Sequence, residues 1–235
     1  MPIKRPELVK GGIYHIVLRG LEEIFKDESD YYRGIFSIYE FNNASPVVIR
    51  ERRKARQREK AEANREQFSV DKRDQFIEIL AFCFMPNHIH LLLRQIKDDG
   101  ISKFMRKFGA GYATYFNKKY NRAGHLFQSR FRAVAIQTAE QLKNVFVYIH
   151  TNPISLKEPG WKEKGIKEVE GMIRFLENYK WSSYIDYFGK KNFPSVTKRE
   201  FIIQTIGGEE NCKEFVESWI KYKGDIRTLA EVVLE

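Results

Sequence analysis

Apolar residues follow two different periods along the chain, and these periods predict strands and helices. Alternate apolar positions, or short runs of β-branched and aromatic residues, are typical of strands, whereas spacings of three and four are typical of amphipathic helices. Strands are predicted at residues 12–18, 76–84, 88–94 and 133–136, and helices at residues 30–42, 101–120 and 138–151. The order is β-α-β-β-α-β followed by one more helix, which indicates an α+β protein.

The last of these helices has clear signals at both ends. Thr138 followed by Gln141 has the form of a capping box. Pro153 pushes the residue before it out of the helical region, so the helix is expected to end near Thr151. Its predicted buried stripe consists of Leu142, Val145, Phe146 and Ile149.

Residues 44–75 break this pattern. Residues 50–66 are rich in helix formers of both charges but have no apolar stripe, so they lack a face that would pack on a core. We expect a solvated helical arm or a partly disordered insertion, with contact to a phosphate backbone as the alternative.

Apolar residues at helical spacing return after Phe188. They are Phe201, Ile202, Ile206, Phe215, Trp219 and Ile220. We therefore expect a main domain over residues 1–190, with the charged insertion at about 44–75, and a C-terminal helical extension over residues 191–235.

Composition adds a prediction about the partner. The chain has 235 residues, of which 43% are hydrophobic, enough for a packed core. Its formal net charge of +10 favours a polyanionic partner, because Lys and Arg release counterions when they neutralise phosphates. Charge alone does not separate DNA from RNA or from an anionic membrane surface.

Cysteine content and hydropathy predict the compartment. Two cysteines, Cys83 and Cys212, do not form a disulfide framework, and the first residues lack an apolar signal region. Apolar runs are too short to span a bilayer. We expect a soluble cytoplasmic protein without a membrane segment.

The strand after Pro86 contains a candidate metal site. Because successive strand side chains point to opposite faces, His88 and His90 project from one face and Ile89 from the other. Two imidazoles on one face suit a divalent cation, although a strand histidine is more often structural. A structural role is the interpretation we give to His15 on the first strand.

A phenol and a carboxamide lie on the last predicted helix. Tyr148 sits at the edge of the buried stripe, and Asn152 follows one turn later on the same side. Both side chains are therefore expected to approach a common point on the sheet. His150 points almost oppositely, so it is not expected to be a ligand.

A segment that mixes cations with aromatic residues separates the histidines from this helix. Such a mixture contacts phosphates and stacks on unpaired bases, since every base offers a π-face. A plain basic loop is the equally weighted alternative. The candidate DNA-binding residues are Arg122, His125, Phe127, Gln128, Arg130 and Arg132.

Taken in order, these motifs resemble a known family. His88-Ile89-His90 followed by the Tyr148 to Pro153 segment resembles the Y1-type HUH transposases of the IS200 class. The segments 124–131 and 181–184 are similar to those of its REP-associated tyrosine transposase branch. The resemblance covers roughly residues 11–189, and four ordered motifs are far more specific than a single pair of histidines.

The resemblance implies a fold and a reaction. The fold is a ferredoxin-like, RRM-like βαββαβ antiparallel sheet with helices on one face. His88 and His90 match the metal pair, Tyr148 matches the nucleophile, and Asn152 occupies the position of a polar third ligand. The implied metal is Mg²⁺ or Mn²⁺, which prefer open, oxygen-containing sites, although imidazole binds Zn²⁺ more strongly in vitro.

The family's implied activity is metal-dependent cleavage and transfer of single-stranded DNA that carries a hairpin. Attack by the tyrosine leaves a 5′-phosphotyrosine link and a free 3′-hydroxyl, which can attack back without ATP. The protein would act as a monomer or a homodimer. A catalytically silent DNA-hairpin-binding regulator is the alternative. An RRM-like RNA binder is less favoured, because aromatic sheet residues in the RNA-stacking pattern are not evident.

Two departures from the family pattern concern segments of unassigned role. The charged insertion is longer than the usual connection to the histidine hairpin. The C-terminal extension is expected either to cover the core or to bind DNA.

Overall fold

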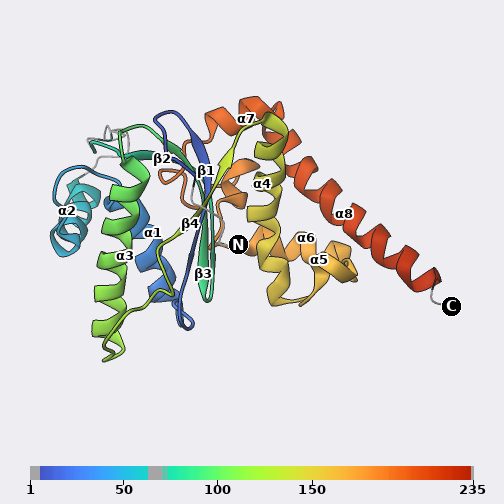
Figure 1. The fold of residues 1–235 in the computed structure, drawn as a ribbon, viewed down its shortest axis with the longest axis horizontal. Helices are drawn as coiled ribbons and strands as arrows, with labels where there is room; N and C mark the ends of the chain where they lie inside the picture. Colours follow the sequence, from blue (N-terminus) through green and yellow to red (C-terminus); the bar gives the residue numbers. More distant parts are fainter. Residues whose placement is uncertain (1–5, 63–70, 72, 234–235) are drawn as a thin grey trace.

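Four antiparallel strands form the centre of the protein. The computed structural model describes residues 6–62, 71 and 73–233. The strands are β1 (Ile13–Arg19), β2 (Ile77–Met85), β3 (His88–Gln95) and β4 (Arg132–Ile136). They are arranged in the order β2-β3-β1-β4, with every neighbouring pair antiparallel (Figure 1). The predicted α+β class is confirmed, and β2 and β3 pair as a hairpin that turns at Pro86 and Asn87.

Two helices, α1 (Glu28–Glu40) and α3 (Gly100–Lys119), cover one face of the sheet. Side chains at alternate strand positions, such as Ile89, Leu91 and Leu93, pack against them in the first hydrophobic core. The N-cap of α1 is Asp27, whose carboxylate accepts from the amide of Asp30. The helix therefore begins at Glu28, two residues before the start that the helical spacing of apolar residues predicts.

The opposite face of the sheet is also covered. The helix α4 (Ala139–Thr151) lies there, and Thr138 caps it by accepting from the amide of Gln141 at 3.1 Å. The expectation of helices on one face therefore holds for α1 and α3 only. The reason is that α4 has an apolar stripe of its own, which the second face of the sheet buries.

The chain after α4 builds the outer layer of this second core. Its elements are η1 (Asn152–Leu156), α5 (Trp161–Lys164), α6 (Val169–Asn178), η2 (Tyr184–Tyr187), α7 (Glu200–Ile206) and α8 (Glu209–Val233). Ile202, Cys212, Val216 and Ile220 are fully buried in it. The described part of the C-terminal extension thus covers the core, and α8 continues away from the body of the molecule (Figure 1).

The outer edge of β2 is covered by residues 181–183. The amide of Phe84 donates to the carbonyl of Trp181 at 2.9 Å, and the amide of Ser183 donates to the carbonyl of Phe82 at 3.0 Å. The hydroxyl of Ser183 also bonds to Nε2 of His150 at 2.8 Å. His150 is therefore a buried structural residue on the far side of α4 from Tyr148, as the helical spacing predicts.

The charged segment forms a helix, α2 (Ile49–Glu62), beside α1 and at the opposite end of the molecule from α8 (Figure 1). Arg52 and Arg56 of α2 pair with the fully buried carboxylate of Glu40 on α1. Ion pairs therefore dock this helix, although Ile49 is also buried. The rest of the predicted arm, residues 63–70 and 72, lies outside the described residues.

Between residues 6 and 233, apart from the undescribed positions, no helix is both long and apolar enough to cross a bilayer.

Candidate active site

His88 and His90 lie on the face of β3 that is turned toward α4. In the sheet register His88 is opposite Arg19 of β1, and His90 is opposite Val17. Their neighbour Leu92 points the same way, into the second core. The alternation of strand side chains thus places both imidazoles on one face of a central strand, as expected.

Tyr148 projects from α4 onto His90. Its ring meets the ring of His90 edge-on, with 5.5 Å between the ring centroids. The side chain is 37% exposed, whereas His90 is only 3% exposed. The phenol is therefore open to an incoming molecule and covers the histidine beneath it.

A third imidazole, from His15 of β1, completes the cluster. Its Nε2 lies 3.0 Å from Nδ1 of His90, and the two rings stack with centroids 5.2 Å apart. The ring of His15 also meets Tyr148 edge-on at 5.7 Å. Sequence reasoning gave His15 only a structural role. The order of strands in the sheet brings β1 beside β3, and the sequence pattern does not reveal that order.

The hydrogen bonds of the imidazoles indicate which ring nitrogens are available. Nδ1 of His88 lies 2.6 Å from the amide oxygen of Asn87, which only accepts, so that nitrogen carries the proton and Nε2 has the lone pair. In His90, Nε2 is buried without a hydrogen-bond partner. If Nδ1 of His90 donates to His15, Nε2 of His90 also carries a lone pair. His88 and His90 would then each offer one Nε2 lone pair to a metal ion, so this pair fits a metal site.

Burial keeps these imidazoles uncharged at neutral pH. It lowers the pKa of His15 to about 4. It also lowers the pKa of His88 to about 4, with smaller contributions from the charges of Arg19 and Lys162. Burial lowers the pKa of His90 still further, well below its ordinary value. Neutral imidazole is the form that binds metal.

Asn152 stands at the start of η1, where α4 ends, and is buried. Its Nδ2 donates to the backbone carbonyl of Tyr148 at 3.0 Å, and it makes no hydrogen bond to His88 or His90 in the described chain. Over the same residues, no group of three or more His, Cys, Asp or Glu side chains has the arrangement of a metal site. The predicted third ligand is thus one turn from Tyr148 but is not joined to the histidines.

Lys162 of α5 reaches Tyr148 from the C-terminal part of the chain. Its Nζ donates to the phenolic oxygen at 3.3 Å and lies 4.3 Å from the ring centroid. The carbonyl of Lys162 accepts from Nζ of Lys223 on α8 at 2.9 Å, which holds α5 in place. Sequence analysis missed this lysine because a four-residue helix shows no periodicity.

The basic segment between α3 and β4 runs past the end of β1 nearest the histidines. The amide of Gln128 donates to the carbonyl of Arg19 at 3.0 Å, and Arg19 is the cross-strand partner of His88. His125, Gln128 and Arg130 are exposed there. Of these candidates, Gln128 therefore lies beside the end of β1 that pairs with His88, and His125 and Arg130 belong to the same segment.

The other three candidates differ in their surroundings. Arg122 is tied to Glu22 by an ion pair of 2.6 Å, and Phe127 packs against the first core, so both support the loop. Arg132 is exposed on β4 opposite Val17, which is itself opposite His90. Its side chain therefore points to the same face of the sheet as the histidine. Roles in DNA binding stay predictions for all six residues.

Comparison with known proteins adds a family match. Residues 43–152 match the family model described as "Transposase IS200 like". A search of curated proteins found no match. The protein is similar to a solved REP-associated tyrosine transposase bound to a REP hairpin, at 15% identity and a TM-score of 0.49, covering 83% of this chain and 90% of the other.

A second solved structure, the tRNA(His) guanylyltransferase of Saccharomyces cerevisiae, is similar at 11% identity and a TM-score of 0.30, covering 94% and 81% of the two chains. The family match includes both histidines, Tyr148 and Asn152. Residues 43–152, just under half of the chain, thus carry the similarity to IS200-like transposases.

Proposed function

We propose that the protein is a metal-dependent endonuclease and strand transferase that acts on single-stranded DNA carrying a hairpin, in the REP-associated branch of its family. The observation that supports this most directly is that an exposed phenol, Tyr148, lies against the ring of His90, and that His88 lies beside His90 on the same face of β3. All of these groups come from one chain. A protein that only bound DNA would have no need of this combination.

The metal site would be held by His88 and His90. Their Nε2 atoms would bind Mg²⁺ or Mn²⁺, with the amide oxygen of Asn152 as the proposed third ligand. When bound, the ion would polarise the scissile phosphate and neutralise part of its charge.

Tyr148 is the proposed nucleophile. Its phenolic oxygen attacks the phosphorus and loses its proton, and the bond from phosphorus to the 3′ oxygen breaks. The products are a 5′-phosphotyrosine link and a strand that ends in a 3′-hydroxyl. Because the link retains the energy of the broken bond, a 3′-hydroxyl can attack it, rejoin the strands and release the tyrosine.

Lys162 supports the same step. Its ammonium group is within hydrogen-bond reach of the phenolic oxygen, so it stabilises the negative charge that develops there as the proton leaves. The proposed role of the exposed cations Arg130 and Arg132 is to hold phosphates of the bound strand beside this oxygen.

Capture of a covalent adduct tests the proposal. The protein is incubated with Mn²⁺ and a pool of labelled hairpins whose single-stranded flanks are randomised, and products are separated under denaturing conditions. We expect a labelled protein band that depends on the metal and disappears in Tyr148→Phe. The matched control is Tyr222→Phe, because Tyr222 is 59% exposed on α8 and lies outside the site.

Two results would contradict the enzyme. Tight hairpin binding without any adduct would favour the catalytically silent regulator. An adduct that persists in Tyr148→Phe would assign the nucleophile to another residue.

A further inference from the structure

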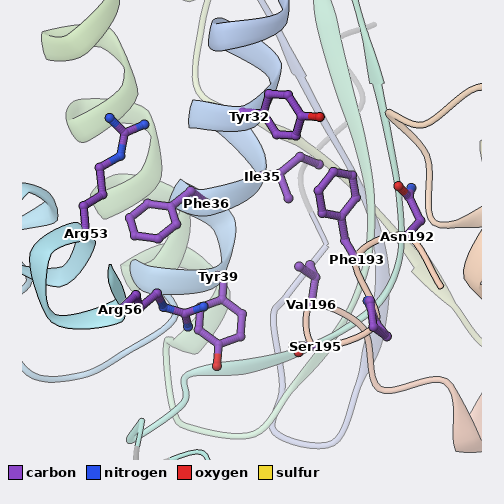
Figure 2. Close-up of a pocket in the computed structure, with 11 residues that line it drawn as sticks. Tyr32, Ile35, Phe36, Tyr39, Arg53, Arg56, Asn192, Phe193, Ser195 and Val196 are labelled. Atoms are coloured by element: carbon purple, nitrogen blue, oxygen red, sulfur yellow. The ribbon is translucent and has the colours of Figure 1, made fainter. Parts of the chain in front are cut away.

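A solvent-open pocket of about 380 Å³ lies between α1, α2 and the segment 192–196. It is on the α1 side of the sheet, whereas His90 and Tyr148 are on the α4 side. Figure 2 shows Tyr32 and Tyr39 at its two ends, with Ile35 and Phe193 between them. The pocket is therefore separate from the site described above.

Four of the eleven residues that line the pocket are aromatic. Tyr32 is 46% exposed, and its ring meets that of Phe193 edge-on at 6.2 Å. Phe36 and Tyr39 follow on the same helix (Figure 2). The volume is in the range of pockets that bind small organic groups. Flat rings beside a half-open cavity suit a planar, aromatic ligand.

Cations from the charged insertion line one side of the pocket. Both carboxylate oxygens of Glu40 are occupied, one by Nε of Arg52 at 2.8 Å and the other by Nε of Arg56 at 2.7 Å. Arg53 lies over the ring of Phe36 and makes no ion pair within the described part of the chain. A guanidinium without an acidic partner is available to an external anion.

We propose that this pocket binds an unpaired nucleotide of the single-stranded DNA substrate, with the base against the rings of Tyr32 and Phe193 and a phosphate at Arg53. Base stacking on aromatic rings beside a cationic groove is the general chemistry of single-strand binding. The assignment rests on the proposed function, since it assumes a DNA substrate. It gives the charged insertion a role in contacting phosphate.

This pocket and Tyr148 lie on opposite sides of the sheet. The nucleotide bound in the pocket is therefore not the nucleotide at the scissile bond. The pocket is built by α1, the charged helix α2 and the start of the C-terminal extension. Affinity for single-stranded DNA should therefore depend on residues outside the histidine and tyrosine motifs.

Binding of a labelled oligothymidylate tests the inference without any need for a target hairpin. One thymidine is replaced by a fluorescent adenine analogue that is quenched on stacking, and the measurement is made with Tyr148→Phe protein in chelator. Tyr32→Ala and Arg53→Ala are each expected to weaken binding by at least about fivefold, and Tyr32→Ala also removes the quenching.

Matched controls are Tyr222→Ala, an exposed tyrosine elsewhere, and Arg58→Ala, which removes a cation from α2 roughly 140° round the helix from Arg53. Both should bind about as tightly as the parent protein. Circular dichroism checks the fold of each variant, and Arg53→Ala removes an exposed side chain that the core does not need.

Unchanged affinity and quenching in both pocket variants would overturn the inference, as would equal losses in the controls. Failure of the proposed function has a different signature, because it is read from the covalent adduct at Tyr148. If oligothymidylate binding depends on Tyr32 and Arg53 but no adduct forms, the pocket is still a nucleotide-binding site. The proposed strand-transfer activity is then wrong.

Discussion

The three imidazoles of the site, those of His15, His88 and His90, differ in which ring nitrogens have a hydrogen-bond partner. His88 is oriented by the amide oxygen of Asn87, and His90 is oriented by His15, so both have a partner at Nδ1. Such partners fix the tautomer of a ligating histidine and the direction of its ring. We therefore infer that His15 is a positioning residue, which acts on the metal through His90.

Replacing His15 tests this role through metal binding. His15→Phe keeps a ring of similar size but removes the hydrogen-bond acceptor, so His90 is no longer held in one tautomer. Affinity for Mn²⁺, measured by calorimetry without DNA, is expected to fall by about 10- to 100-fold. His125→Phe, at an exposed loop position, should leave it unchanged. Equal affinity in His15→Phe and the parent protein would contradict the role.

Lys162 allows a test of the nucleophile. Lys162→Met retains the apolar stem but removes the hydrogen bond to the phenolic oxygen, so adduct formation should slow by about 10- to 100-fold. Hairpin affinity should change little. The control is Lys164→Met on the same short helix, and equal rates of adduct formation in the two variants would argue against Lys162.

Residues within one element were easier to predict than residues that meet across elements. The shared face of His88 and His90 follows from strand alternation, and the one-turn separation of Tyr148 and Asn152 follows from the helical repeat. His15 and Lys162 reach the site through strand order and a short helix. Neither of these leaves a local pattern in the sequence.

At the scale of elements, a charged cluster joins α1 to the end of α3. The carboxylate of Asp30, fully buried, accepts from Lys119 and Tyr120, each at 2.7 Å, and from Tyr115 at 2.9 Å. Burial by itself would raise the pKa of Asp30, but these donors outweigh it and the pKa is lowered. The charged form is therefore the one that stabilises the fold.

The pH dependence of stability follows from the direction of this shift. A lowered folded-state pKa contributes stability above the unfolded value, near 4, and the contribution is lost as pH falls through the folded pKa. Asp30→Asn should reduce the free energy of unfolding by about 1–3 kcal/mol at pH 7 and by less in acid. Urea denaturation at several pH values measures this, with exposed Asp98→Asn as control. A difference that grows in acid would contradict the assignment.

Most elements were predictable because their apolar periods are strong, and β1, β3 and α4 lie close to their predicted positions. The second layer of helices was not predicted, since a stripe on a helix does not say which face of a sheet it covers. Docking of α2 was also missed, because it depends on ion pairs between α2 and a buried glutamate of α1, and a stretch of mixed charges does not show which of its arginines will pair.

At the scale of the whole molecule, the C-terminal helices are part of the fold that presents the site. Trp161, next to Lys162, is buried against Trp219 of α8, with ring centroids 5.4 Å apart. The packing of α8 therefore determines where α5 stands. All the groups assigned to the reaction come from one chain, so a monomer is expected to be active, which sedimentation of the active protein checks.

A cavity in this second core tests the contribution of α8. Ile220→Ala removes a fully buried side chain, and the free energy of unfolding is expected to fall by about 2–4 kcal/mol. Tyr222→Ala, on the exposed side of the same helix, should change it by less than about 0.5 kcal/mol. Chemical denaturation followed by circular dichroism compares the two. Similar small losses would mean that α8 is only loosely attached.

The bonds between β2 and residues 181–183 have a consequence for self-association. An unpaired strand edge invites addition of a strand from another molecule, and here one edge is already occupied by the chain itself. The other edge is β4, a strand of five residues with exposed Arg132, which is short and charged. Neither edge of the sheet therefore favours the addition of a strand from another molecule. The protein should tolerate high concentration without forming fibres.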